Sequence, residues 1–503
     1  MNTKRLPTLS TLQRPAQVLC IGGYFLLSHF AFPQGNIIPT TAPTLPIMKT
    51  LDQVEPRKDI ATLSGDASNQ VVISAAGSYY LTSNLGATKI NGIHITVAGV
   101  TVDLNGFQIS RSAGSGGSGV LIDSVGDRCT IKNGAITGFF SGIGAPGSRA
   151  CLFRSLTVSN CSDVGFNLGQ SAVIESCRAV DNGNSGFTAG SAASLTACTA
   201  IGNALAGISA DNNSTLTNCS AQNNSAGGIA AFGNSTLTNC VASNNGGVGI
   251  FASGSLINCS AVSNNGTHGI QAGNGTVLTG CSANSNTATI AAIFVGDGGS
   301  LTNCSAQGNT TPNAIVAGEG CSLANCAAHQ NTSTASISAG FNTGIGCTIT
   351  NCSATRNTST AATFTSTTGV GFIVGSEGNI QGSTASINLG DGIRVFGACT
   401  VRHNNCTRNG SGSGDGAGIH ALGSGGGDNR IESNNVIGND RGIDVDTTGN
   451  FITKNTASGN TNNWDVVSGN VLLVVSATTA VAVSGNSGGV APGSTDPNAN
   501  FSY

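Results

Sequence analysis

A motif built around Leu-Thr-Asn-Cys-Ser-Ala returns along much of this chain, each time with an asparagine five residues after the cysteine. Successive cysteines of the series are 19 to 26 residues apart, and the first three intervals are each 21 residues. A period near 21 predicts a solenoid, in which each repeat forms one coil stacked on the previous coil. The cysteines of the series are Cys177, Cys198, Cys219, Cys240, Cys259, Cys281, Cys304, Cys326 and Cys352.

The asparagines of the motif form a second series with the same period. They are Asn182, Asn203, Asn224, Asn245, Asn264, Asn286, Asn309, Asn331 and Asn357. Further on, Ser383, Asn404, Asn434 and Asn455 take the cysteine position, and Asn388, Asn409, Asn439 and Asn460 follow them five residues later. Stacked asparagines can satisfy corner backbone groups and bond to the amide in the next coil. We therefore interpret this series as structural.

Within a coil, apolar and polar residues alternate with the period of a β-strand, and Gly and Asn separate the short alternating runs. Once per coil a glycine precedes an apolar residue, as at Gly228-Ile229 and Gly249-Ile250. We expect the apolar residue to face the interior and the glycine to form a corner. The apolar series continues through Ile293, Ile315, Ile337, Phe372, Ile393, Ile419 and Ile443.

These repeats resemble the right-handed parallel β-helix of the pectin-lyase-like superfamily over about residues 90–465. The segment Val-Thr-Val-Asp-Leu-Asn-Gly-Phe-Gln-Ile at residues 100–109 is similar to the opening coil of exported bacterial members. The resemblance implies an all-β, single-stranded right-handed parallel β-helix with about 21–23 residues per coil and a cap at each end. Superfamily members include polysaccharide lyases, glycoside hydrolases, epimerases, phage tailspikes and adhesins, so the pattern is specific for the fold and not for an activity.

The chain divides into four predicted parts. Residues 1–35 carry basic residues before an apolar run, which predicts an export signal, and the run is shorter than the roughly 18–20 apolar residues of a membrane span. Residues 36–89 are the expected N-terminal cap, 90–465 the β-helix and 466–503 a C-terminal cap or tail. We expect a secreted or cell-surface protein with no membrane span in the mature chain.

Composition excludes several partners and indicates free thiols. With 20 basic and 23 acidic side chains, the chain lacks the basic stripe that nucleic-acid binding requires. Its 17 cysteines would suggest disulfides in an exported protein. However, equivalent positions in stacked coils have parallel Cβ directions, which suit the disulfide torsion poorly, so we predict buried thiols. The absence of Cys-x2-Cys pairs with histidine partners argues against a metal site of the zinc type.

The residue after each inward apolar residue forms a column that we expect to face solvent. Three charged members, Arg394, His420 and Asp444, fall on consecutive coils, with Asp391 and Asp446 nearby. In a catalytic site, Arg394 would hold a uronate carboxylate and His420 would act as base or acid, while Asp444 and Asp446 would orient it or hold Ca²⁺. The alternative is that these charges are simply solvated. The full column is Asn167, Thr188, Ser209, Ala230, Phe251, Gln271, Phe294, Val316, Ser338, Ile373, Arg394, His420 and Asp444.

Two aromatic members of the column, Phe251 and Phe294, are candidate binding residues because aromatic rings stack on sugars. The alternative is that both are ordinary exposed apolar residues without a binding role. The paired aspartates, Gly-His-Gly and Arg-Ile-Lys of polygalacturonases are missing, and so is the Asp-Pro-His of mannuronan epimerases. No calcium-binding Gly-Gly-x-Gly-x-Asp array is present either.

The missing signatures favour a non-enzymatic surface, adhesion or carbohydrate-binding protein without a cofactor, whose partner is a polysaccharide or cell-surface glycan. The alternative is a polysaccharide lyase or glycoside hydrolase that acts on a uronate polymer along the outward face of the C-terminal coils, with Ca²⁺ if it is a lyase. A groove around the charged column would favour the enzyme, and a flat strand face would exclude it.

From the missing signatures we expect purified protein to degrade neither pectate nor alginate. Reducing-end release and the ultraviolet absorbance of unsaturated products measure the two possible reactions. Turnover of either polymer that His420→Ala abolishes would contradict this expectation.

Overall fold

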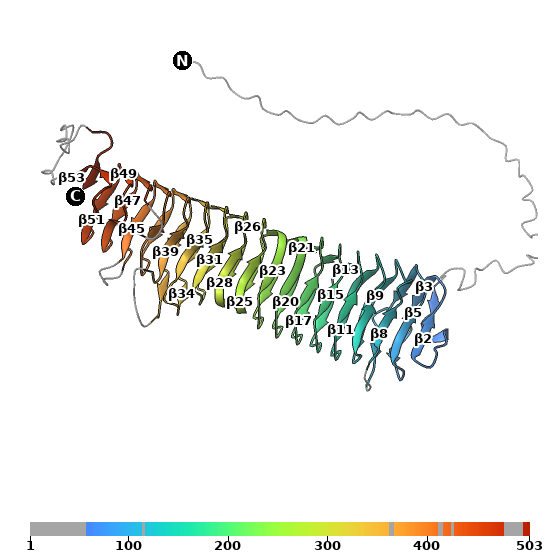
Figure 1. Cartoon of the computed structure of the whole chain (residues 1–503). Coiled ribbons are helices and arrows are strands. Elements are labelled where there is room, and N and C mark those ends of the chain that lie inside the picture. Colours follow the sequence, from blue (N-terminus) through green and yellow to red (C-terminus); the bar gives the residue numbers. More distant parts are fainter. Residues whose placement is uncertain (1–56, 113–115, 362–366, 411–415, 424–426, 477–495) are drawn as a thin grey trace, which may run out of the picture. The chain divides into compact units, whose positions relative to one another are not determined.

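The structure is a computed structural model that describes residues 57–112, 116–361, 367–410, 416–423, 427–476 and 496–503. The predicted export signal and the first part of the predicted N-terminal cap lie outside the described residues. The unit from Arg57 to Tyr503 is a parallel β-helix in which successive coils stack along one axis (Figure 1). In the described ranges, the only helical element is the 3-10 turn η1, Ile60–Thr62, and no helix there is long and apolar enough to cross a membrane.

One face of the β-helix carries the predicted charged column. Its strands pair in parallel from one coil to the next. In order they are β2 (Asn69–Ile73), β5 (Asn91–Ile95), β8 (Ser118–Ile122), β10 (Ser141–Ala145), β12 (Phe166–Leu168), β15 (Phe187–Ala189), β18 (Ile208–Ala210), β21 (Ile229–Thr238), β23 (Ile250–Ile257), β25 (Asn265–Ala272), β28 (Thr287–Val295), β31 (Asn313–Ala317), β35 (Ala339–Thr343), β39 (Val370–Val374), β42 (Ile393–Val395), β45 (Ala417–Ala421), β48 (Arg441–Val445) and β51 (Asn462–Val466).

The other two faces are built in the same way. The second runs from β3 (Gly77–Tyr80) to β52 (Val471–Leu472), and the third from β4 (Leu85–Gly86) to β54 (Asn500–Ser502). Longer strands such as β11 (Leu152–Ser159) continue around a corner and pair on both of these faces. All strand pairs described are parallel, as the repeat predicts, and they keep equivalent residues opposite one another except for register shifts in β21–β23 and β25–β28.

Parallel pairing extends beyond the segment in which the motif is recognisable. β1 (Lys58–Asp59) pairs with β3, and β2 pairs with β5, so coils begin inside the segment expected to be an N-terminal cap. At the other end, β54 from the expected tail pairs with β50 (Thr456–Ser458). The motif does not show where the β-helix begins and ends. Parallel pairing uses backbone groups, which are present whatever the side chains are.

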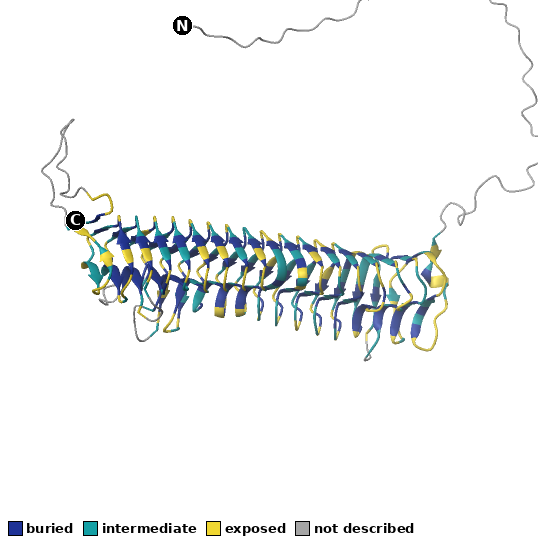
Figure 2. Ribbon diagram, turned by 45° about the horizontal axis from the view of Figure 1, so that its top comes forward, coloured by how far each residue is buried: buried dark blue, intermediate teal, exposed yellow. Residues whose placement is uncertain are grey.

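The interior is one continuous core of buried Ile, Leu, Val, Phe, Cys and Ala residues that extends along the stacked coils, and Figure 2 shows the buried segments in dark blue. Ile208, Ile229 and Ile250 lie opposite one another in register and are fully buried. All sixteen cysteines of the described ranges are buried free thiols, which confirms that prediction. The Cys219 thiol donates to the carbonyl oxygen of Leu195 in the previous coil at 3.5 Å, so burial does not leave it without a partner.

The asparagine series forms a continuous hydrogen-bonded ladder, as predicted. The Oδ1 atom of Asn224 accepts from the backbone N and from the Nδ2 of Asn203, at 3.0 and 2.9 Å. Its Nδ2 donates to Oδ1 of Asn245 at 2.9 Å and to the carbonyl oxygen of Ala200 at 3.3 Å. Each buried amide is therefore fully satisfied by its neighbours, which removes the cost of burying it.

The residue before each ladder position turns the chain through the left-handed region. Asn218, just before Cys219, has φ of 54°, and Asn223, just before Asn224, has φ of 55°. Asparagine tolerates this conformation better than most residues because its short side chain bonds locally. The Asn-Cys pair of the motif is thus a corner residue followed by an inward one.

Gly228, which precedes an inward apolar residue, lies in the bend before β21, as expected, and its role there is close packing and not a left-handed conformation. Gly228 has no positive φ. A Cβ atom added there would lie 2.5 Å from the carbonyl oxygen of Gly249, 2.7 Å from the Cβ of Ala242 and 2.8 Å from the Nδ2 of Asn245. The coils approach so closely at this point that only glycine fits.

One assignment of the apolar series is wrong. Phe341, not Ile337, lies opposite Ile315 and Phe372 in the interior, and Asn342, not Ser338, therefore occupies the outward column. Ile337 is exposed. The coil after Cys326 is longer than 21 residues, and its extra residues precede β35, so counting a fixed period from the previous coil stops too early.

We expect Gly228→Ala to lower the free energy of unfolding by about 1–3 kcal/mol, because the added methyl group overpacks the coil interface. Gly227→Ala is the matched control, since a Cβ there meets only the carbonyl oxygen of Val248, at 3.4 Å. Its effect should stay within about 0.5 kcal/mol. Denaturant unfolding followed by circular dichroism measures both, and equal destabilisation of the two variants would contradict the close-packing explanation.

Candidate functional site

The outward column on the first face ends in charged residues, as predicted. Arg394 on β42, His420 on β45 and Asp444 on β48 lie directly opposite one another in register. Asp465 on β51 continues the column. Asp465 was not predicted from the sequence, because Trp464 and not an aliphatic residue precedes it at the inward position.

The expectation that this column faces solvent is wrong for its three charged members. Arg394, His420 and Asp444 are 2%, 3% and 2% exposed. Strand alternation does direct them away from the interior, but long side chains on coils about 4.8 Å apart cover one another. The residues two positions later, Phe396, Leu422 and Asp446, stand on the same side of their strands.

Asp391 lies at the corner before β42 and belongs to the same cluster. It is fully buried, and its Oδ2 accepts from Nε and Nη2 of Arg394 at 2.9 and 2.6 Å. The same oxygen lies 2.9 Å from Nδ1 of His420, and Oδ1 accepts from the backbone N of Ala417 at 2.7 Å. A buried carboxylate is stable only when it is paired in this way, so Asp391 fixes both the arginine and the histidine.

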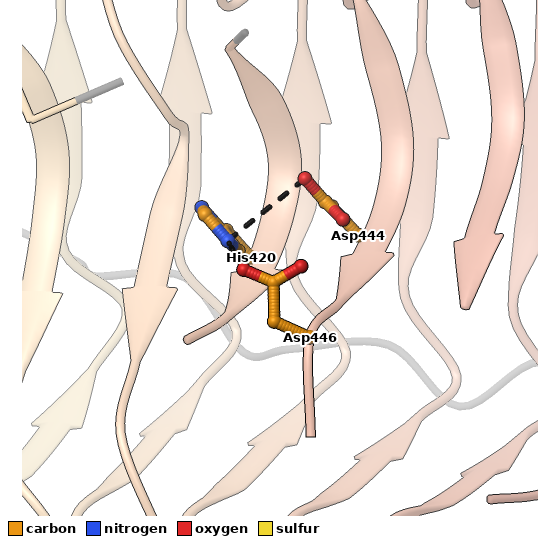
Figure 3. Close-up of side chains that lie close together, drawn as sticks. All are labelled: His420, Asp444 and Asp446. Atoms are coloured by element: carbon orange, nitrogen blue, oxygen red, sulfur yellow. Dashed lines mark hydrogen bonds and ion pairs between the residues drawn. The ribbon is translucent and has the colours of Figure 1, made fainter. Parts of the chain in front are cut away.

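The other side of the His420 ring faces two carboxylates from the next coil (Figure 3). Its Nε2 lies 3.1 Å from Oδ2 of Asp446 and 3.8 Å from Oδ2 of Asp444. Asp446 is half-exposed, whereas Asp444 is buried. The nitrogen and oxygen atoms of His420, Asp444 and Asp446 lie within 4.8 Å of one another, so these residues form the group in the described ranges best suited to hold a cation.

Arg441 and Asp465 complete the cluster toward the C-terminus. The Nη1 of Arg441 donates to Oδ2 of Asp444 at 2.6 Å, and its Nε lies 3.4 Å from Oδ2 of Asp465. Arg441 was missed because it lies three residues before the column position, and Asp465 was missed because Trp464 precedes it. Across four consecutive coils, each cationic group of the cluster thus contacts at least one carboxylate.

The surroundings shift two pKa values in this cluster. Burial disfavours the imidazolium form of His420, but the hydrogen bond and charge of Asp391, together with Asp444 and Asp446, raise its pKa to about 9. Burial raises the pKa of Asp444 above its ordinary value, although His420 and Arg441 partly oppose this effect. His420 is therefore a proton donor at neutral pH.

A pocket of about 370 Å³ adjoins the cluster. Three consecutive members of the column, Asn342, Ile373 and Arg394, line it, together with Phe396 and Leu422. The strand face is therefore hollowed beside the charged residues and not flat. Its lining combines apolar side chains with a few polar ones, as ligand sites commonly do.

The two predicted aromatic residues lie in the same column but outside this pocket. Phe251 packs against Phe232, with ring centroids 5.4 Å apart, and Phe294 packs against His268, also at 5.4 Å. Both are half-buried. The structure thus brings together the predicted charged residues and leaves the predicted aromatic residues several coils away.

Comparison with known families agrees with the architecture. Residues 73–215 and 118–265 match the family described as right handed beta helix region. The match covers less than half of the chain and agrees with its fold, which is a right-handed parallel β-helix. A comparison with curated proteins finds no match.

Several solved β-helix structures are similar to this chain at low identity. The catalytic domain of a GH87 alpha-1,3-glucanase variant in complex with tetrasaccharides is 12% identical, with a TM-score of 0.30 over 71% of this chain and 66% of that chain. The Agl-KA catalytic domain is 16% identical, with a TM-score of 0.32 over 63% and 59%. The A-module of the Azotobacter vinelandii mannuronan C-5 epimerase AlgE6 is 13% identical, with a TM-score of 0.28 over 82% and 98%. The chain spans slightly less than two thirds of the first two domains, and the likeness concerns the fold alone.

The raised pKa of His420 predicts a loss of stability as pH rises. Below pH about 6.5 the histidine is protonated in both the folded and the unfolded chain, so its contribution is fully present. That contribution, on the order of a few kcal/mol, is lost as pH rises toward and through 9, because only the folded state holds the proton in this window.

Denaturant unfolding of chelator-treated protein between pH 6 and 8 measures this loss before most unfolded thiols ionise. His420→Gln is the control, and it should remove most of the pH slope. An identical slope in both proteins would show that His420 does not carry the effect.

Proposed function

We propose that this protein is an exported polysaccharide-binding β-helix whose binding face runs along the column from Asn342 to Asp465. The observation that carries the proposal is the pocket beside Arg394, which continues directly into the charged cluster. Six coils separated by about 4.8 Å give a face of roughly 24 Å, enough for several sugar units of an extended chain.

The pocket chemistry suits a sugar ring. Phe396, Ile373 and Leu422 offer apolar surface for the C–H faces of a pyranose, and Asn342 offers hydrogen-bonding groups. Aromatic and aliphatic contacts of this kind give most of the binding free energy, while a few polar groups fix the orientation of the ligand.

Arg394 is the polar group best placed to contact a ligand. Asp391 engages its Nε and Nη2, and no partner among the described residues accepts from Nη1. The guanidinium is thus held in place with one nitrogen left for a sugar hydroxyl or a uronate carboxylate. A comparison of binding to neutral glucans with binding to uronate polymers shows whether Arg394 contacts a hydroxyl or a carboxylate.

Cleavage of a bound polysaccharide is a second candidate, and one observation favours it. Two carboxyl groups, Asp444 and Asp446, stand beside a protonated His420 in unlike environments, one buried and one half-exposed. Enzymes that cleave glycosidic bonds use paired carboxyl groups whose pKa values differ, one as acid and one as base or nucleophile. Turnover that Asp446→Asn abolishes would favour this candidate over simple binding.

We expect Phe396→Ala to weaken polysaccharide binding about five- to tenfold, because it removes an aromatic wall of the pocket. Phe251→Ala is the matched control, since Phe251 is a half-buried aromatic residue on the same face outside the pocket. Affinity electrophoresis in gels that contain neutral glucans, pectate or alginate measures binding. Equal losses in both variants, or no retardation by any polymer, would overturn the proposal.

A further inference from the structure

We propose that His420, Asp444 and Asp446 form a binding site for a divalent first-row transition metal, with Zn²⁺ as the representative ion. The three side chains come from two adjacent coils. His420 and Asp444 lie opposite one another in register, and Asp446 projects from the same side of its strand, two residues later.

The distances fit a metal ion. A tetrahedral Zn²⁺ with bonds of about 2.0–2.2 Å holds its ligand atoms about 3.3–3.6 Å apart. The Nε2 of His420 lies 3.1 Å from Oδ2 of Asp446 and 3.8 Å from Oδ2 of Asp444, so small side-chain rotations would bring all three atoms into range. Three protein ligands leave the fourth position for water.

Asp391 is not one of the three ligands, but it holds the His420 ring in the orientation that a metal site needs. Metal-binding histidines usually give their other ring N–H to a carboxylate, which fixes the ring and raises its basicity. Asp391 takes this position at Nδ1 of His420, at 2.9 Å. Arg394 and the backbone N of Ala417 hold Asp391 in turn, so Nε2 is directed at Asp444 and Asp446.

Asp444 offers an open oxygen to such an ion. The residue is 2% exposed, its Oδ2 is engaged by Arg441, and no partner among the described residues bonds to Oδ1. Oδ1 is not one of the buried side-chain atoms that lack a partner, so it keeps contact with solvent. A cation can therefore reach this oxygen.

The charge balance and the ligand types decide which ion fits. A metal-binding histidine is neutral, so the four carboxylates Asp391, Asp444, Asp446 and Asp465 outnumber the cationic groups Arg394 and Arg441 by two, which a divalent cation balances. Imidazole nitrogen suits Zn²⁺ and its neighbours in the first transition row, whereas Ca²⁺ prefers oxygen ligands in larger numbers. This site therefore differs from the Ca²⁺ site considered from the sequence.

The test uses the full untagged chain after chelator treatment, titrated with ZnCl₂, CoCl₂ and CaCl₂ by calorimetry and absorbance. We expect one Zn²⁺ per chain, weaker binding of Ca²⁺, and cobalt d–d bands without a thiolate charge-transfer band. Asp446→Asn should weaken Zn²⁺ binding at least about tenfold, and Asp391→Asn about 10- to 100-fold.

Asp123→Asn is the matched control, because Asp123 is a similarly exposed aspartate that also lies beside a histidine, 2.8 Å from Nε2 of His94, and is outside the cluster. It should change the Zn²⁺ Kd by less than twofold. Stoichiometric binding that Asp446→Asn leaves unchanged, absence of Zn²⁺ binding at millimolar concentration, or tighter Ca²⁺ than Zn²⁺ binding would overturn the proposal. Because the readout is metal binding in the absence of glycan, it is independent of the polysaccharide experiment.

Discussion

Parallel backbone pairing in a fixed register sets each side chain of one coil against its counterpart in the next, and the rest of the structure depends on this constraint. Identical neighbours must therefore be compatible with one another. Isoleucine meets this condition by packing. Asparagine meets it because its amide is both donor and acceptor, so each Asn accepts from one coil and donates to the next. Glycine meets it at Gly228, where the backbones approach too closely for any Cβ.

The same register brings charged residues together on the outer face. Arg394, His420 and Asp444 occupy one column on consecutive coils, and like charges there would repel one another at about 4.8 Å. Asp391 bonds to both Arg394 and His420, and it accepts four hydrogen bonds from groups that would otherwise be buried without partners. The result is a rigid set of side chains in which one arginine nitrogen, one carboxylate oxygen and the exposed edge of Asp446 are left for a ligand.

Much of the fold was predictable because its signals are periodic. The cysteine, asparagine and apolar series predicted coils, parallel strands, buried thiols and the asparagine ladder, and the structure confirms these features. An error arose where the period changes. The coil before β35 is longer, so Phe341 and not Ile337 takes the inward position. The close packing at the repeated glycine was not predicted, because an approach between coils leaves no trace in a single repeat.

The candidate site was predictable only in part. The column position of Arg394, His420 and Asp444 followed from the repeat alone. Their burial, the pocket beside Arg394 and the bonds from Asp391, Arg441 and Asp465 did not.

The sequence by itself determined which residues point inward and which point outward, because side-chain direction alternates along a strand whatever surrounds it. Only the tertiary structure decided which outward residues are covered. Exposure depends on the lengths of side chains on neighbouring coils, and those neighbours are 21 or more residues away in the chain.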